Sequence, residues 1–259
     1  MPRAGAGRGG YGMGENSMVT IDIPLSQGVS ASHIFGRIDD HAAPIVLLFM
    51  DGFGPRPTLF AIAERLAGEG YRVVLPDLFY RHQPFVPLEP GSLFGGGPDR
   101  QRIMTMLSAL DQPAVDGDIA RLLSFCDGEL GTAASIGAVG YCLGGRYALT
   151  AATASARVTS ASSFHGSNLA PETGDGAYAR FADVRASIYV GIAAIDPTFG
   201  GAEEGRLAAA LRDAKVDHMI EIYAGAAHGF VMDDLPVYHP AAAARHWQRL
   251  TSGLRNAFV

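Results

Sequence analysis

The most constraining feature of this sequence is a short apolar run that enters a glycine-flanked cysteine and then continues as a helix. Residues 136–139 favour a strand, Gly140-Tyr-Cys142-Leu-Gly144 follows, and apolar residues recur at helical spacing from Tyr147 onward. Glycines two residues before and two residues after the cysteine permit a tight turn whose central residue adopts a strained backbone conformation. This layout is typical of a nucleophile elbow, with cysteine in the nucleophile position.

A cysteine at such a turn stands at the N-terminus of the following helix, where the partial positive charge of the helix favours a thiolate. We expect the backbone N–H of Leu143 to face an oxyanion that develops during attack by Cys142. A glycine-rich turn around a buried structural thiol is the alternative explanation of the same pattern. The residues that could assist the cysteine therefore decide between the two.

From residue 19 onward, β-rich runs alternate with helical patterns, which predicts an α/β fold with a sheet covered by helices on both faces. Residues 19–23 and 33–38 predict an antiparallel pair at one edge of the sheet. A buried strand is predicted at 45–50, and a helix near 58–68 buries an apolar face. Further strands are predicted at 72–75, 136–139, 158–164, 188–192 and 219–223, and a last helix near 241–257.

Two segments fall outside this alternation. Residues 1–18 are rich in glycine and lack the apolar core of a secretory signal, so we expect a flexible leader before a single domain at 19–259. Residues 79–98 contain four prolines and a run of three glycines. A loop of this length inside a compact domain is usually functional or disordered, and we favour a loop over the active site against a plain surface excursion.

Composition excludes several classes of function. The net charge is −6 and the 20 basic residues form no run, so nucleic acid is not an expected partner. No apolar stretch approaches the roughly 20 residues that cross a bilayer, so no membrane span is expected. Two cysteines cannot form a disulfide framework, which favours a reducing cytoplasm. No spacing typical of a metal site occurs, and neither a metal nor a cofactor is expected.

A cysteine nucleophile needs a base, and the base needs an acid that orients it. In hydrolases built on this elbow, the three follow in the order nucleophile, acid, histidine. Asp196 comes just after the predicted strand 188–192, and His228 lies in a small-residue loop after 219–223. Their order predicts a triad of Cys142, His228 and Asp196. Six further histidines fit structural or solvated positions better: His33, His41, His82, His218, His239 and His246.

These motifs resemble those of the dienelactone hydrolase family, the cysteine-nucleophile branch of the α/β-hydrolases. The resemblance covers most of the chain from about residue 19 and rests on the following segments: Asp51-Gly-Phe-Gly54, Pro76-Asp-Leu78 with Arg81, Gly140-Tyr-Cys142-Leu-Gly-Gly145, Asp196 and His228-Gly-Phe230. It implies an α/β-hydrolase fold and hydrolysis of a small ester or lactone through an acyl-cysteine intermediate. It also implies that the Gly52 N–H is a second oxyanion donor and that Arg81 holds a substrate carboxylate.

Two positions depart from the family pattern. The family has a glutamate beside the nucleophile where this chain has Asp51, and the segment after His228 lacks a second basic residue that dienelactone hydrolysis would use. Both differences argue against dienelactone itself as the substrate. Asp51 either modulates the thiol or only caps its own turn. His165, at the end of the predicted strand 158–164, either contacts substrate or packs within its loop.

Two other functions fit a thiolate at a helix N-terminus. The protein could be a redox sensor, because such a thiolate is also an oxidation site, or it could be non-catalytic. Cys126 falls in a helical pattern with Ile119, Leu122 and Leu123, which predicts a core position and not a resolving partner. The sequence leaves the oligomeric state open.

Overall fold

The computed structural model describes residues 18–83, 88, 98–131, 135–173 and 176–258. The predicted leader, except for residue 18, and most of the predicted loop over the active site lie outside these described residues. No helix in the described part is long and apolar enough to span a membrane.

An eight-stranded sheet forms the centre of the protein, in the order β1-β2-β4-β3-β5-β6-β7-β8. Its strands are β1 (Val19–Leu25), β2 (Gly28–Phe35), β3 (Ile45–Phe49), β4 (Arg72–Leu75), β5 (Ile136–Tyr141), β6 (Val158–Phe164), β7 (Ser187–Ile195) and β8 (His218–Ala227). Strand β2 pairs antiparallel with both β1 and β4, whereas every other pairing in the sheet is parallel. The predicted mostly parallel sheet with an antiparallel edge is therefore confirmed.

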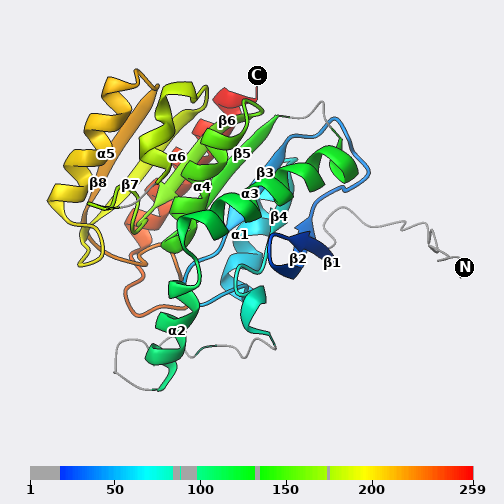
Figure 1. Cartoon of the computed structure of the whole chain (residues 1–259), viewed down its shortest axis with the longest axis horizontal. Helices are drawn as coiled ribbons and strands as arrows, with labels where there is room; N and C mark the ends of the chain where they lie inside the picture. The colour runs from blue at the N-terminus through cyan, green and yellow to red at the C-terminus, as the bar shows by residue number, and fades with distance from the viewer. Residues whose placement is uncertain (1–17, 84–87, 89–97, 132–134, 174–175, 259) are drawn as a thin grey trace, which may run out of the picture.

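Helices cover both faces of this sheet. The α-helices of the described residues are α1 (Pro57–Gly68), α2 (Pro98–Ser108), α3 (Gln112–Phe125), α4 (Leu143–Ala154), α5 (Gly201–Asp213) and α6 (Pro240–Ala257), of which α2 lies apart from the sheet (Figure 1). In Figure 1, α3, α4 and α5 lie in front of the sheet and α6 lies behind it. Helix α1 shares the rear face with α6, because the guanidinium of Arg65 lies 4.0 Å from the centre of the Trp247 ring.

The local sequence explains most of these elements. Helix α1 buries Leu59, Ile62, Ala63 and Leu66, the apolar face that its spacing predicts.

The predicted start of β2 was wrong, since the strand begins at Gly28, directly after a two-residue turn. Its inward-facing side there carries the buried hydroxyls of Ser30 and Ser32, while Val29 is half exposed, so the apolar alternation that marks a strand is missing.

The carboxyl ends of the parallel strands all point to one edge of the sheet. The chain leaves β3, β5, β6, β7 and β8 at this edge just before Asp51, Cys142, His165, Asp196 and His228. Strands β3, β4 and β5 are buried along their whole length, so the residues at this edge are held by strands of the core. Ligand sites of open parallel sheets lie at this end.

Candidate active site

The turn between β5 and α4 has the strained geometry that its sequence predicts. Cys142 has φ 55° and ψ −120°, a conformation that residues with side chains rarely adopt. A Cβ atom built on Gly140 would lie 1.9 Å from the carbonyl oxygen of Gly144. A Cβ on Gly144 would lie 2.5 Å from the carbonyl oxygens of Phe49 and Met50. Only glycine fits at either position, and the turn packs directly against the end of β3.

The predicted oxyanion donors lie at this junction. Leu143 is the first residue of α4, and Gly52 follows β3 by three residues, in a segment that is buried. In the described part of the chain, neither backbone N–H donates a hydrogen bond to a protein acceptor. Stabilisation of an oxyanion requires N–H groups that are not already engaged by the protein, and both groups meet this requirement.

His228 and Asp196 are brought together by the paired ends of β7 and β8. The backbone N–H of His228 donates to the carbonyl of Ile195 at 3.1 Å, and its Nδ1 lies 2.7 Å from Oδ2 of Asp196. The imidazole also lies close enough to Cys142 for that side chain to affect its pKa. Burial opposes protonation of this ring, but the interactions with Cys142 and Asp196 outweigh it and raise the pKa of His228 to about 10.

Thr198 belongs to the same cluster and was not predicted from the sequence. Its hydroxyl lies 2.7 Å from Oδ1 of Asp196 and 3.2 Å from Nδ1 of His228, and its backbone N–H donates to the same Oδ1 at 2.8 Å. The signal was present, because an aspartate two residues before a threonine is the pattern of a turn closed by the aspartate side chain. Thr198 and His228 together fix the orientation of the Asp196 carboxylate.

Asp51 is engaged by its own turn and by an arginine. Its carboxylate accepts the backbone N–H of Phe53 at 3.0 Å and both terminal nitrogens of Arg56, at 2.6 and 2.9 Å. Arg56 also binds Asp234, and the pKa of Arg56 is raised because these two carboxylates outweigh the effect of burial. Of the two predicted roles for Asp51, the turn-capping role accounts for these contacts. Arg56 and Asp234 were not identified from the sequence.

The charge of Arg81 is paired within the protein. Its guanidinium forms a two-nitrogen contact with the Asp118 carboxylate, at 3.0 Å for each nitrogen, and its Nε donates to Gln27 at 2.8 Å. The Asp118 carboxylate is completely buried and also accepts hydrogen bonds from three hydroxyls: those of Ser26, Tyr80 and Tyr147. The protein thus supplies a carboxylate partner for Arg81, and the expected contact with a substrate carboxylate stays a prediction.

His165 lies against the His228 ring. Its own ring is 1% exposed, with a centroid 5.1 Å from that of His228 in an edge-to-face arrangement. Neither of its ring nitrogens has a hydrogen-bond partner among the described residues. Burial, with the nearby charge of His228, holds the pKa of His165 well below its usual value, so the ring is neutral.

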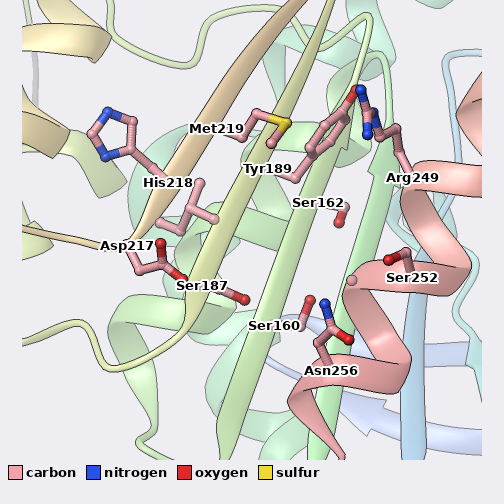
Figure 2. Close-up of a pocket in the computed structure, with 12 residues that line it drawn as sticks. Ser160, Ser162, Ser187, Tyr189, Asp217, His218, Met219, Arg249, Ser252 and Asn256 are labelled. Atoms are coloured by element: carbon pink, nitrogen blue, oxygen red, sulfur yellow. The ribbon is translucent and has the colours of Figure 1, made fainter.

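Two cavities lie away from these residues. One, of about 250 Å³, opens between α6 and strands β6 to β8, and hydroxyls of Ser160, Ser162 and Ser187 line it, as Figure 2 shows. The other, of about 340 Å³, lies between α3, α4 and the loop after β6, with Arg146 and Asn168 in its wall. None of the predicted site residues lines either cavity. Within the described residues, no group of three or more metal-binding side chains is placed to hold a metal ion.

Comparison with known proteins agrees with this architecture. A dienelactone hydrolase-like phosphotriesterase, P91, from metagenomic libraries has a TM-score of 0.75 at 20% identity over 95% of this chain and 100% of its own. Dienelactone hydrolase from Anabaena variabilis has a TM-score of 0.63 at 17% identity over 95% of this chain and 100% of its own. At these identities the structures show the fold alone, and that fold is the α/β-hydrolase fold.

Sequence comparison identifies the family within the α/β-hydrolase fold. The family model for the dienelactone hydrolase family matches residues 34–258, so the chain belongs to that family. A Salmonella typhimurium relative named "Putative carboxymethylenebutenolidase" is 26% identical over 238 residues, which is 87% of this chain and 82% of the relative. Carboxymethylenebutenolidase 1 of Cupriavidus pinatubonensis is 28% identical over 141 residues, 52% of this chain and 56% of that one. The protein is a carboxylic ester hydrolase of the dienelactone hydrolase type.

Proposed function

We propose that this protein hydrolyses a small ester or lactone through an acyl-cysteine intermediate, with Cys142 as nucleophile, His228 as acid and base, and Asp196 as the group that orients His228. The observation that carries the proposal is the position of the His228 ring. One of its nitrogens binds Asp196 at 2.7 Å, and the ring also lies close to the side chain of Cys142 in a strained elbow. A nucleophile, a base and an orienting acid in this arrangement make up the minimal machinery for acyl transfer.

In the acylation step, Sγ of Cys142 attacks the carbonyl carbon of the ester as a thiolate. The electron pair of the carbonyl moves to its oxygen, which the N–H groups of Gly52 and Leu143 stabilise. The oxyanion then re-forms the carbonyl and the bond to the alcohol oxygen breaks. His228, protonated in the resting enzyme because its pKa is raised to about 10, donates its proton to the leaving oxygen.

Acylation itself prepares His228 for the second step. Once the sulfur carries an acyl group it has no charge, so one of the interactions that raise the pKa of His228 is lost while the opposing effect of burial remains. The neutral ring then accepts a proton from water, whose oxygen attacks the thioester carbonyl. The C–S bond breaks, the acid leaves and the thiolate returns beside the imidazolium. Ester and water are thus converted to acid and alcohol.

The charges near the site favour an uncharged substrate. The basic residue that the family resemblance offered for a carboxylate, Arg81, is neutralised by Asp118, and Arg56, which binds Asp51 next to Gly52, faces two carboxylates. We infer that substrate binding does not depend on a substrate carboxylate. Two p-nitrophenyl esters with four-carbon acyl groups test this inference: the ester of butyric acid, and the monoester of succinic acid, which adds only a terminal carboxylate.

The experiment is a screen of chromogenic esters and small lactones with the purified protein, with Cys142→Ala as the matched control. We expect turnover by the wild type, loss of turnover in the variant, and a higher kcat/KM for the butyrate than for the succinate monoester. Turnover by Cys142→Ala at the wild-type rate would contradict the proposed nucleophile. A preference for the succinate monoester would contradict the inferred uncharged substrate.

The redox alternative lacks a resolving thiol. Cys126 is completely buried in the π-helical turn after α3, and burial raises its pKa to about 12, so it remains a protonated thiol. Both cysteines are free in the structure. Hydrolytic use of Cys142 requires that it stay reduced, so we propose a reducing compartment such as the cytoplasm.

A further inference from the structure

His165 occupies an unusual place for a polar side chain. It follows β6, its backbone N–H donates to the carbonyl of Gly191 at 2.8 Å, and its φ is 39°. Its ring packs edge-to-face on Phe230 as well as on His228, with centroids 5.4 and 5.1 Å apart, and lies 5.8 Å from the Tyr141 ring. The imidazole is thus wedged between two buried aromatic rings and the proposed base.

The hydrogen bonds of His228 hold one of its ring nitrogens more firmly than the other. Thr198 and Asp196 both lie within hydrogen-bond distance of Nδ1, at 3.2 and 2.7 Å, which leaves Nε2 for Cys142. The ring turns about its Cβ–Cγ bond, and such a rotation carries Nε2 away from Cys142. A side chain packed beside the ring opposes this rotation.

We propose that His165 is a positioning residue, whose neutral ring packs beside the imidazole of His228 and fixes its orientation between Asp196 and Cys142. This inference rests on the proposed function of His228. It assigns His165 neither a substrate contact nor a proton transfer, since its ring is almost completely buried.

The absence of partners for both His165 nitrogens among the described residues supports a role for the ring as a surface. A buried imidazole that acted through a hydrogen bond would have that bond in place, because an unpaired buried polar group is destabilising. The planar shape of the His165 ring is then the property that acts on His228. Tyr223 stacks on Phe230 at 4.7 Å, so the wall behind His165 is itself braced against β8.

The test compares two substitutions at position 165. His165→Phe keeps a planar ring and removes only the nitrogens, whereas His165→Asn suits the left-handed backbone but removes the ring. We expect kcat to fall roughly tenfold to a hundredfold in His165→Asn with little change in KM, because misplacement of a catalytic group slows the chemical step. His165→Phe should retain kcat close to that of the wild type.

His246→Asn is the matched control. His246 is also a completely buried imidazole near Tyr141, with its Nε2 2.9 Å from the Tyr141 hydroxyl, but its ring packs on Phe164 and Trp247. We expect its replacement to lower Tm and to leave the kcat of folded protein unchanged. If His165→Asn does not fold, His165→Leu replaces it with the same expectation.

A second measurement does not depend on turnover. The rate at which iodoacetamide alkylates Cys142 at neutral pH reports the interaction of the thiol with His228, and it should fall in His165→Asn and recover in His165→Phe. Wild-type kcat and alkylation in folded His165→Asn would overturn the positioning role, as would a loss in His165→Phe equal to that in His165→Asn. If wild type hydrolysed no ester while alkylation still followed this order, the proposed function would fail and the positioning role would stand.

Discussion

Two buried polar clusters in this protein each centre on an aspartate, and they differ in what they leave open. Asp118 accepts hydrogen bonds from Ser26, Tyr80, Arg81 and Tyr147, and its carboxylate is completely buried. Asp196 binds His228 and Thr198, Cys142 has a strained conformation, and the N–H groups of Gly52 and Leu143 have no acceptor among the described residues. The carboxylate of the first cluster is saturated with hydrogen bonds, whereas the second cluster keeps groups without partners in the described protein.

The difference separates a structural network from the proposed catalytic one. A saturated ion pair ties its elements together, here the turn after β1, the chain after β4, and helices α3 and α4, and offers nothing to a substrate. Backbone strain and N–H groups without acceptors are destabilising and persist where the surroundings enforce them, which is typical of active sites. Substitution of the two clusters should therefore have opposite effects on activity and stability.

The largest expected effect is on activity in the open cluster. Cys142→Ala should reduce ester hydrolysis by roughly 10²-fold or more, because removal of a nucleophile disables the whole triad. Its Tm should fall less than that of Arg81→Ala, since the thiol is partly exposed whereas the Asp118 carboxylate is completely buried. Steady-state kinetics and thermal denaturation of the same preparation measure both. Cys126→Ala is the control for loss of a thiol and should retain activity.

The saturated cluster should respond in the opposite way. Arg81→Ala leaves the Asp118 carboxylate buried without its counter-ion, which should lower the free energy of unfolding by about 3–5 kcal/mol. The protein that remains folded should hydrolyse p-nitrophenyl butyrate and the succinate monoester in the wild-type ratio. Denaturant unfolding gives the first quantity, and kinetics below the unfolding transition gives the second. A selective loss of the succinate monoester would restore Arg81 as a substrate contact.

The charge of His228 gives the open cluster a distinct pH dependence. Folding raises the pKa of His228 from the usual 6.5 to about 10, so its contribution to stability is complete below pH 6.5 and is lost as pH rises to about 10. In the wild type the ring protons of His228 should therefore titrate in NMR with a midpoint near pH 10. In Asp196→Asn the midpoint should lie lower, because the substitution removes a carboxylate whose interaction raises this pKa. A wild-type midpoint near pH 6.5 would contradict an imidazolium in the resting protein.

The smallest expected effect concerns Asp51. Because Arg56 already neutralises its carboxylate, Asp51→Asn should change the alkylation rate of Cys142 by less than about fivefold, the effect of a screened charge worth up to about 1 kcal/mol. It should lower Tm modestly through loss of the contact with Arg56. Arg56→Gln, which removes the counter-ion and keeps Asp51, is the matched variant. An alkylation rate that rises strongly in Asp51→Asn would show that the carboxylate acts on the thiol directly.

The fold and the order of the proposed site residues could be predicted from local patterns in the sequence. Glycines at fixed spacing around Cys142 report a close approach within one turn, and a strand followed by a polar residue places Asp196 and His228 at the sheet edge. The role of Arg81 could not be predicted in this way. Its partner Asp118 lies 37 residues further along the chain. It is on helix α3, and the sequence pattern of a helix predicts a solvent-exposed position for a single aspartate.

The same limit applies to other contacts that join distant parts of the chain. Arg56 and Asp234 are 178 residues apart, and no local signal pairs them. The burial of His165 depends on a ring from β5 and two rings from the segment after β8. Contacts between side chains that are distant in sequence are determined by tertiary packing, which a local sequence pattern does not contain. Turns, helix caps and strand ends are determined by a few neighbouring residues.

Trapping the acyl-enzyme tests the central claim most directly. Wild-type protein is mixed with p-nitrophenyl butyrate, quenched in acid during turnover, digested and mapped by mass spectrometry, with Cys142→Ala treated in parallel. We predict one butyryl group on the peptide that contains Cys142, carried as a thioester at that residue, and none on the peptide that contains Cys126. A butyryl group on any other residue during turnover, or turnover by the wild type with the same unmodified peptides as Cys142→Ala, would contradict the account.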